Sequence, residues 1–243
     1  MREFEFVKDI AQGARGARAK LVQECLVHHV FHVVVDGKFG PATRTAVALF
    51  QSANALAPTG VVDRSTFDAL VAPFLRVQRA IDGTGHTLGT LTVAYARQHL
   101  AEHPIEIGGQ NRGPWVRLYM GGVDGDAQLW CAGFVCFCLG QACTTLGVAK
   151  PIAFSVSCDA LARSAKAKGR FTSDASQVPA GSLFLLRGQV AGDWIHVGIV
   201  TEAAAETFSS IEGNTDQQGS RNGFEVCART RGWRSKDYIL IDG

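Results

Sequence analysis

The order of the apolar patterns along the chain most constrains what this sequence can fold into. Up to about residue 166 apolar side chains recur at helical spacing, and beyond residue 181 they form short strand-like runs separated by Gly, Asn and Asp. A chain with helices first and strands afterwards is predicted to be α+β, with helices packed on an antiparallel sheet. The expected strands are 182–186, 195–201, 207–211, 224–229 and 238–241.

The first part of the chain contains three helical patterns joined by two turns. The expected helices lie at 17–30, 41–53 and 63–74. Pro41 suits a first helical position after the glycine-rich turn 36–40, and Asp63 suits an N-cap. We therefore expect a small three-helix domain over residues 14–76.

The remainder is expected to form a linker and a second domain. Residues 77–90 are rich in turn formers, as a connector would be. The second domain, residues 91–243, should begin with a helix that ends near Glu102, followed by a glycine-rich loop around 108–114. Two further helical patterns start near Trp130 and near residue 157.

Charge and hydropathy exclude several classes of protein. The chain has 24 Lys+Arg and 22 Asp+Glu. Nine basic and seven acidic residues precede residue 77, and 15 basic and 15 acidic residues follow from there on. Neither half carries the basic excess that nucleic-acid binding usually needs, so no nucleic-acid partner is expected. No apolar run reaches about 18 residues, so membrane insertion is not expected. We expect synthesis in the cytoplasm without a signal peptide, and a monomer is favoured.

The seven cysteines are odd in number, which argues against a disulfide framework. No pair has zinc-site spacing, and most are expected to be small buried side chains. His28 and His32 are four apart and could face one another on a helix, but no acidic residue or cysteine completes a set locally. Packing is the favoured interpretation there, and no metal site is expected.

Cys131 differs from the other cysteines because it begins a predicted helix directly after a loop. The free N–H groups and partial positive charge of a helix N-terminus stabilise a thiolate, which is the reactive form of cysteine. The same N–H groups can stabilise negative charge that develops on a carbonyl oxygen under attack. Cys136, Cys138 and Cys143 lie deeper in the same pattern, where inert packing is expected.

A cysteine nucleophile needs a base, and His196 stands at the start of an apolar strand pattern. The next strand ends with Glu212 and Asn214, two residues apart. If this strand stays extended, both side chains point to one face, and either could bond the far ring nitrogen of His196. The carboxylate has the larger electrostatic effect on an imidazolium, so Glu212 is expected to be the main orienting residue and Asn214 the second.

The N-terminal patterns resemble the small helical peptidoglycan-binding module of cell-wall hydrolases. The residues that carry this resemblance are Leu21-Val22-Gln23, Asp36-Gly37-Lys38-Phe39-Gly40, Thr43, Ala46-Val47, Phe50-Gln51, Thr59-Gly60-Val61-Val62-Asp63, Thr66 and Leu70. The resemblance implies bacterial peptidoglycan as a partner.

The second half resembles the cysteine, histidine-dependent amidohydrolase/peptidase (CHAP) family of papain-like cell-wall enzymes. The motifs are Trp130-Cys131-Ala132-Gly133-Phe134-Val135, His196-Val197-Gly198-Ile199-Val200 and Glu212-Gly213-Asn214-Thr215. By this resemblance Cys131 is the nucleophile, His196 the base and acid, and Glu212 with Asn214 the orienting residues. Trp130, Asn111 and Trp194 are candidates to line the substrate groove, with a packing role as the alternative for each. Gly181-Ser182 stands where the family has Gly-Asp, and the resemblance implies neither a cofactor nor a metal.

Together the two resemblances imply a cysteine-dependent amidase or endopeptidase that degrades peptidoglycan. A phage endolysin released through a holin is favoured over an antibacterial effector exported by a dedicated machine. The alternatives are a catalytically inactive wall-binding protein and a cysteine acyltransferase or protein peptidase. The sequence leaves open which amide bond is cut and which group is the second oxyanion donor.

Overall fold

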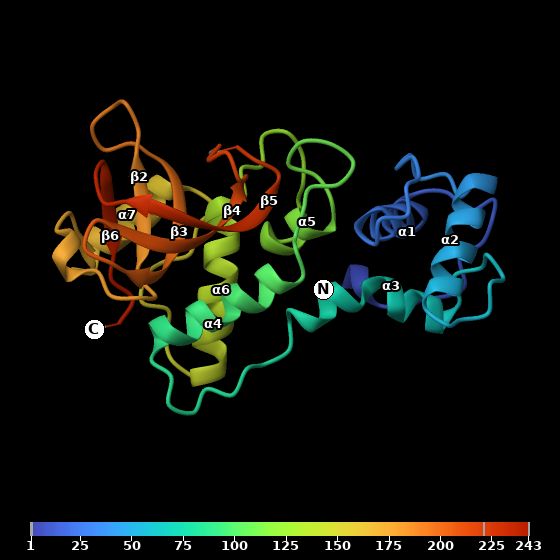
Figure 1. The fold of residues 1–243 in the computed structure, drawn as a ribbon, viewed down its shortest axis with the longest axis horizontal. Coiled ribbons are helices and arrows are strands. Elements are labelled where there is room, and N and C mark those ends of the chain that lie inside the picture. The colour runs from blue at the N-terminus through green and yellow to red at the C-terminus, as the bar shows by residue number, and fades with distance from the viewer. Residues whose placement is uncertain (1, 221, 243) are drawn as a thin grey trace.

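The computed structural model describes residues 2–220 and 222–242, in which helices occupy the first two thirds and a sheet most of the rest (Figure 1). The helices are α1 (Ala17–His28), α2 (Pro41–Ala53), α3 (Arg64–Arg76), α4 (Leu88–Ala101), α5 (Pro114–Tyr119), α6 (Cys131–Leu146) and α7 (Cys158–Ala167). The strands are β1 (Phe171–Thr172), β2 (Leu183–Arg187), β3 (Trp194–Ala203), β4 (Thr207–Thr215), β5 (Glu225–Gly232) and β6 (Lys236–Ile239). Short 3-10 turns lie at Arg2–Phe4 and Ala175–Gln177.

The three N-terminal helices form where the sequence predicts them. One capping carboxylate and two buried glutamine side chains hold their turns. Asp63 caps α3 through its carboxylate, which accepts a hydrogen bond from the backbone N–H of Thr66 at 2.8 Å. The side-chain oxygen of buried Gln23 accepts from the N–H of Gly37 at 2.7 Å, and that of buried Gln51 accepts from Gly60 at 2.9 Å. The two glutamines thereby hold the two loops against the helices.

The six strands form one antiparallel sheet in the order β1-β6-β2-β3-β4-β5. The α+β prediction is confirmed, with the five expected strands present as β2 to β6. Strand β1, of two residues, and helix α5 were not expected. Residues 108–114 were interpreted as loop because of their turn formers, but Pro114 is the first residue of α5.

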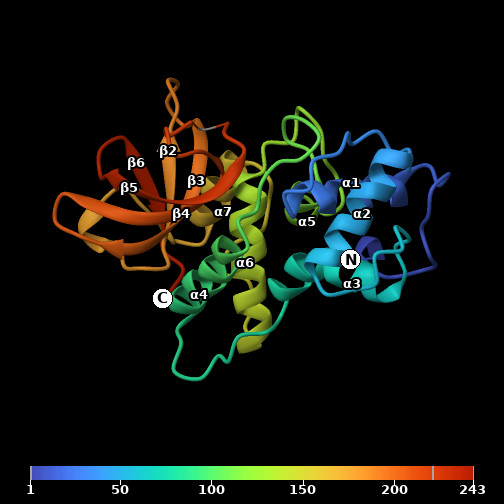
Figure 2. The same cartoon turned by 45° about the vertical axis from the view of Figure 1, so that its right-hand side comes forward.

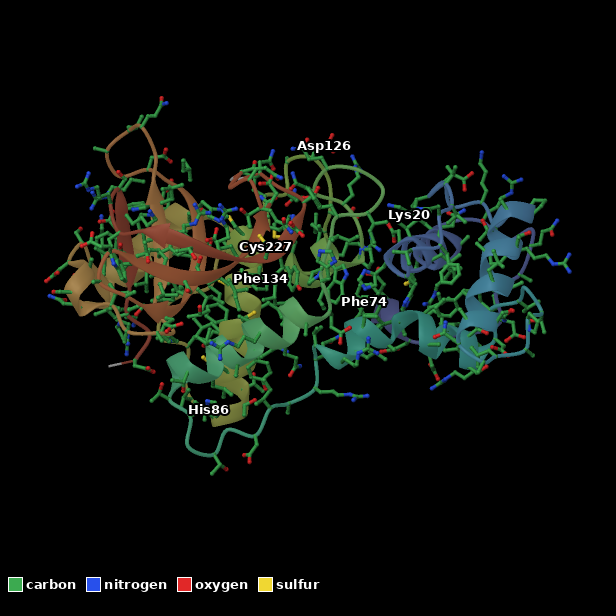
Figure 3. All side chains as sticks on the ribbon, viewed as in Figure 1. Lys20, Phe74, His86, Asp126, Phe134 and Cys227 are labelled. Carbon is green, nitrogen blue, oxygen red and sulfur yellow. The ribbon has the colours of Figure 1, made fainter. Side chains whose placement is uncertain are left out.

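Helix α6 is the central support of the second half of the chain. It packs against α4 on one side and against β3 and β4 on the other (Figure 1). Phe134, on the face of α6 beneath the sheet, is fully buried (Figure 3). A Cβ atom at Gly213 would lie 2.7 Å from the Trp130 ring and 2.8 Å from Phe134, so the glycine permits close contact between β4 and the start of α6.

The N-terminal helices pack directly against the second half of the chain (Figure 2). The rings of Phe74 on α3 and Trp115 on α5 have centroids 4.4 Å apart. Arg117 on α5 forms ion pairs with Glu3 at 2.5 Å and with the fully buried Glu24 of α1 at 2.6 Å. A cavity of about 450 Å³ lies at this junction between α1 and α5.

The expected linker lies along this packed surface. The backbone N–H of Ile81 donates to the hydroxyl of Tyr95 on α4, and Arg76 at the end of α3 pairs with Glu102 at 2.6 Å. The boundaries 14–76, 77–90 and 91–243 stay predictions. In the described part of the chain, no helix combines the length and apolar character needed to cross a membrane.

Candidate active site

The sulfur of Cys131 stands at the first residue of α6, as the sequence predicts. The residue is 4% exposed and its thiol is free. The sulfur interacts with the imidazole of His196 and with the backbone of Val197, both on β3. The N-terminus of α6 and the beginning of β3 therefore meet at this sulfur.

His196 is fully buried and uses its two ring nitrogens differently. Its Nε2 lies 2.8 Å from Oε2 of Glu212 on β4. Within the described residues its Nδ1 has no hydrogen-bond partner, and the nearby Cys131 thiol influences the imidazole. Cys131, His196 and Glu212 thus form a continuous line from α6 through β3 to β4.

The two reacting groups shift one another's protonation. The neighbouring thiol of Cys158 is the largest influence on Cys131; burial opposes it, His196 adds to it, and the pKa of Cys131 falls well below its usual value. Burial disfavours a charged imidazole at His196, but contacts with Cys131 and Glu212 outweigh burial and raise the pKa of His196 to about 9. Both shifts favour a thiolate and imidazolium pair at neutral pH.

Glu212 is held by more groups than the sequence indicates. Arg231 on β5 donates to both carboxylate oxygens, with Nε 2.6 Å from Oε1, and the hydroxyl of Ser210 donates to Oε1. Burial alone would raise the pKa of Glu212, but the hydrogen bonds from Arg231 and His196 lower it to about 2. The carboxylate is therefore ionised throughout the physiological range.

Asn214 does not share the position of Glu212. The pairing of β4 with β5 shifts register between Glu212 and Thr215, and Asn214 adopts a left-handed φ of 56°. The expectation that both side chains point to one face required an extended strand, and the bulge removes that condition. Asn214 is fully buried, and among residues 2–220 and 222–242 neither its amide nitrogen nor its amide oxygen has a hydrogen-bond partner. The structure brings Glu212, and not Asn214, to His196.

Trp130 and Asn111, expected in the substrate groove, are both fully buried. The indole N–H of Trp130 donates to Oε1 of Glu106 at 2.9 Å, and the backbone N–H of Asn111 donates to Oε2 of the same carboxylate at 2.7 Å. Trp130 also stacks on Tyr119. These contacts fix the loop that precedes Cys131, so both residues support the position of the Cys131 side chain; their contact with substrate stays a prediction.

Trp194, the third residue expected in the groove, begins β3 two residues before His196. Its backbone N–H donates to Asp159 at 2.8 Å and its indole N–H donates to Asp237 at 2.9 Å. The residue is 8% exposed. These bonds anchor the start of the strand that carries His196.

Cys158, Arg231 and Ser210 were not singled out from the sequence. Ser210 alternates with Glu212 along one strand, a signal that could have been used. Arg231 depends on the pairing of β4 with β5, and Cys158 on the packing of α7, neither of which the sequence pattern specifies.

No group of three or more His, Cys, Asp or Glu side chains within 2–220 and 222–242 is arranged to hold a metal ion. His28 packs against Phe74 and Trp115, as the packing interpretation expects. The candidate site thus consists of side chains that can act as nucleophile, base and orienting anion.

Comparisons with known proteins identify the N-terminal unit. Residues 15–70 match the family described as "Putative peptidoglycan binding domain". This match confirms the resemblance predicted for the three-helix unit and supports peptidoglycan as a partner. No curated protein matches the chain.

Among solved structures, the chain is similar to the crystal structure of the Burkholderia AP3 phage endolysin, with 26% identity and a TM-score of 0.27. The match covers 38% of this chain and 36% of the endolysin chain. The chain therefore spans little more than a third of that endolysin's length.

Proposed function

We propose that the protein is a peptidoglycan hydrolase that cleaves an amide bond through Cys131. The observation that carries the proposal is the line from Cys131 to His196 to Glu212, in a chain whose residues 15–70 match a peptidoglycan-binding family. A nucleophile, a base and an orienting group in this arrangement are those of papain-like acyl transfer.

The first half of the proposed reaction forms an acyl-enzyme. The Cys131 thiolate attacks the amide carbonyl carbon, and negative charge develops on the carbonyl oxygen. The free N–H groups at the N-terminus of α6 are placed beside the sulfur and can donate to that oxygen. His196 then gives its proton to the leaving amine, and the C–N bond breaks.

The second half releases the product. His196, now neutral, takes a proton from water, and the resulting hydroxide attacks the thioester carbonyl. The C–S bond breaks, and the Cys131 thiolate and the His196 imidazolium are restored. Glu212 keeps one tautomer and one orientation of the imidazole throughout, since its carboxylate is fixed by Arg231.

The helical unit supplies the second element of the proposal. A module that holds the polymer raises the concentration of scissile bonds near Cys131 without changing the chemical barrier. We propose the same polymer for both parts, acted on outside the membrane by a phage endolysin or, as the alternative, by an exported antibacterial effector.

Purified sacculi test the proposal directly. The wild-type chain is expected to lower sacculus turbidity and to release fragments whose mass identifies the bond that was cut, while Cys131→Ser releases none. Cys143→Ser is the matched control, because Cys143 lies on the same helix away from the constellation and should retain activity. EDTA should have no effect, since side chains carry every step. Full activity in Cys131→Ser would refute the mechanism.

A further inference from the structure

Two cysteines meet at the candidate site, and the proposed reaction uses only one. The sulfur of Cys158 lies 3.9 Å from the sulfur of Cys131, and both thiols are free. Cys131 is the first residue of α6 and Cys158 the first residue of α7, so the two helices present their N-termini to one another at this point. At this distance the two sulfurs are close to van der Waals contact, and a disulfide bond, about 2 Å long, requires them to approach further.

The remaining cysteines near the site are directed elsewhere. The thiol of Cys136 donates to the backbone oxygen of Ser155 at 3.4 Å. Cys138 is fully buried within α6, and Cys143 lies near that helix's C-terminal end. Cys158 is therefore the cysteine whose sulfur is in contact with the nucleophile.

The two thiols are chemically unequal in the reduced protein, and this inequality decides which sulfur an oxidant attacks first. The contact lowers the pKa of Cys131 and raises that of Cys158, so one sulfur is a thiolate while the other keeps its proton. The thiolate is the form of cysteine that reacts with oxidants to give a sulfenic acid. A nearby thiol can then condense with the sulfenic acid to form a disulfide.

We propose that Cys131 and Cys158 form a reversible disulfide under oxidation, which makes this pair an oxidation site built into the active centre. With a hydroperoxide as oxidant, the Cys131 thiolate attacks one peroxide oxygen, the O–O bond breaks, hydroxide leaves and Cys131 becomes a sulfenic acid. The Cys158 sulfur then attacks the Cys131 sulfur, an S–S bond forms, the S–O bond breaks and water leaves with the proton of Cys158. Both sulfurs are oxidised, and the peroxide oxygens are reduced to water and hydroxide.

The disulfide removes the nucleophile without destroying it. A dithiol reductant exchanges with the disulfide bond and restores both thiols. A sulfenic acid that is oxidised further to sulfinic acid is not restored by a dithiol. Cys158 would therefore protect Cys131 and silence it in the same step. Formation of the bond does not depend on the proposed function; only its effect on hydrolysis does.

Peptide mapping of the full chain tests the inference. The protein is treated with a small excess of hydrogen peroxide, free thiols are alkylated, and the digest is analysed by mass spectrometry without reduction. We expect a crosslinked pair of peptides that contain Cys131 and Cys158, together with loss of sacculus hydrolysis that dithiothreitol reverses. A Cys131 sulfinic acid beside an alkylated Cys158, or a bond from Cys131 to a different cysteine, would overturn the inference.

Two variants sharpen the result. In Cys158→Ser, peroxide should convert Cys131 to sulfinic acid, and dithiothreitol should restore no activity; in Cys136→Ser, crosslinking and recovery should equal wild type. Circular dichroism checks the fold of each variant, and the wild-type peptide map decides alone if Cys158→Ser does not fold. If the crosslink forms but the wild-type chain never cleaves sacculi, the oxidation site stands and the proposed function fails.

Discussion

Nε2 of His196 lies 2.8 Å from Oε2 of Glu212, and neither residue has any exposed surface. A hydrogen bond between an imidazolium and a carboxylate is strong in such a position because no water competes for either partner. The bond also fixes the orientation of the His196 ring, so β4 holds the proposed base beside Cys131 at the start of α6.

Replacing Glu212 by Gln is expected to lower the rate of hydrolysis about 10 to 1000 fold, the scale of lost general acid–base support. Loss of the carboxylate also lowers the pKa of His196, so the basic limb of the pH profile should move downward from its position near 9. Activity measured against pH on sacculi checks both effects. Asn214→Ala should cost less; if it is inactive while Glu212→Gln is nearly normal, Asn214 is the orienting residue.

Arg231→Gln should change how the free energy of unfolding depends on pH in the acidic range. The pKa of Glu212, about 2, lies below the ordinary 4.5, so its stabilising contribution is complete above about 4.5 and is lost as the pH falls through 2. Without Arg231 the folded-state pKa rises toward 4.5, so the stabilising contribution is smaller and its loss is complete at a higher pH. Other charged or titratable groups near this carboxylate are unchanged in the variant. His196 on β3 lowers the pKa of Glu212, and Glu212 in turn influences the pKa of Cys227 on β5 and of Lys236 on β6.

Urea unfolding at several pH values below 6 measures this shift, with Arg234→Gln as the control because Arg234 is exposed on the turn before β6. Identical pH dependence in the two variants would contradict the role given to Arg231.

Cys158→Ala is expected to raise the pKa of the Cys131 thiol, since the Cys158 thiol is the largest of the influences that lower it. The measurement is the rate at which iodoacetamide alkylates Cys131 as a function of pH, which requires no wall substrate. The midpoint should move upward in Cys158→Ala and stay in place in Cys136→Ala. An unchanged midpoint would mean that His196 and the helix terminus suffice.

Arg117→Ala should destabilise the whole chain by about 3 kcal/mol, because the fully buried carboxylate of Glu24 loses its 2.6 Å ion pair and keeps the longer one, at 3.4 Å, with Lys20. Arg64→Ala removes an exposed pair with Asp68 and should cost less than about 1 kcal/mol. Denaturant unfolding compares the two. Equal costs would show that the cluster around Arg117 contributes no more than a surface ion pair.

Local patterns predicted much of the framework. Asp63 caps α3 and Cys131 begins α6 because capping and apolar periodicity act within a few residues, where the sequence can be examined directly. His196 at the start of a strand followed from the same local reasoning, and the preference for Glu212 followed from the charge of a carboxylate.

Features that depend on distant pairing could not be predicted in this way. Asn214 has a left-handed φ within the register shift between β4 and β5, so the alternation of an extended strand, on which its expected position beside Glu212 depends, does not hold there. Trp130 and Asn111 both donate to the carboxylate of Glu106, which lies 24 residues before Trp130 and five before Asn111. Apolar periodicity does not predict that the two residues share this partner, and their contact with substrate stays a prediction.

The connector after α3 is pinned at Ile81 to Tyr95, and Arg117 joins α5 to α1 and to the N-terminal turn. The anchoring unit and the reactive sulfur are therefore held at a fixed spacing by packed side chains, whatever the length of the connector. If the proposed function holds, this fixed spacing predicts that cleavage of a polymer with a regular repeat falls a set number of repeats from the point of attachment. Insertion of glycines after Asp82 should leave that periodicity unchanged while the Arg117 cluster is intact.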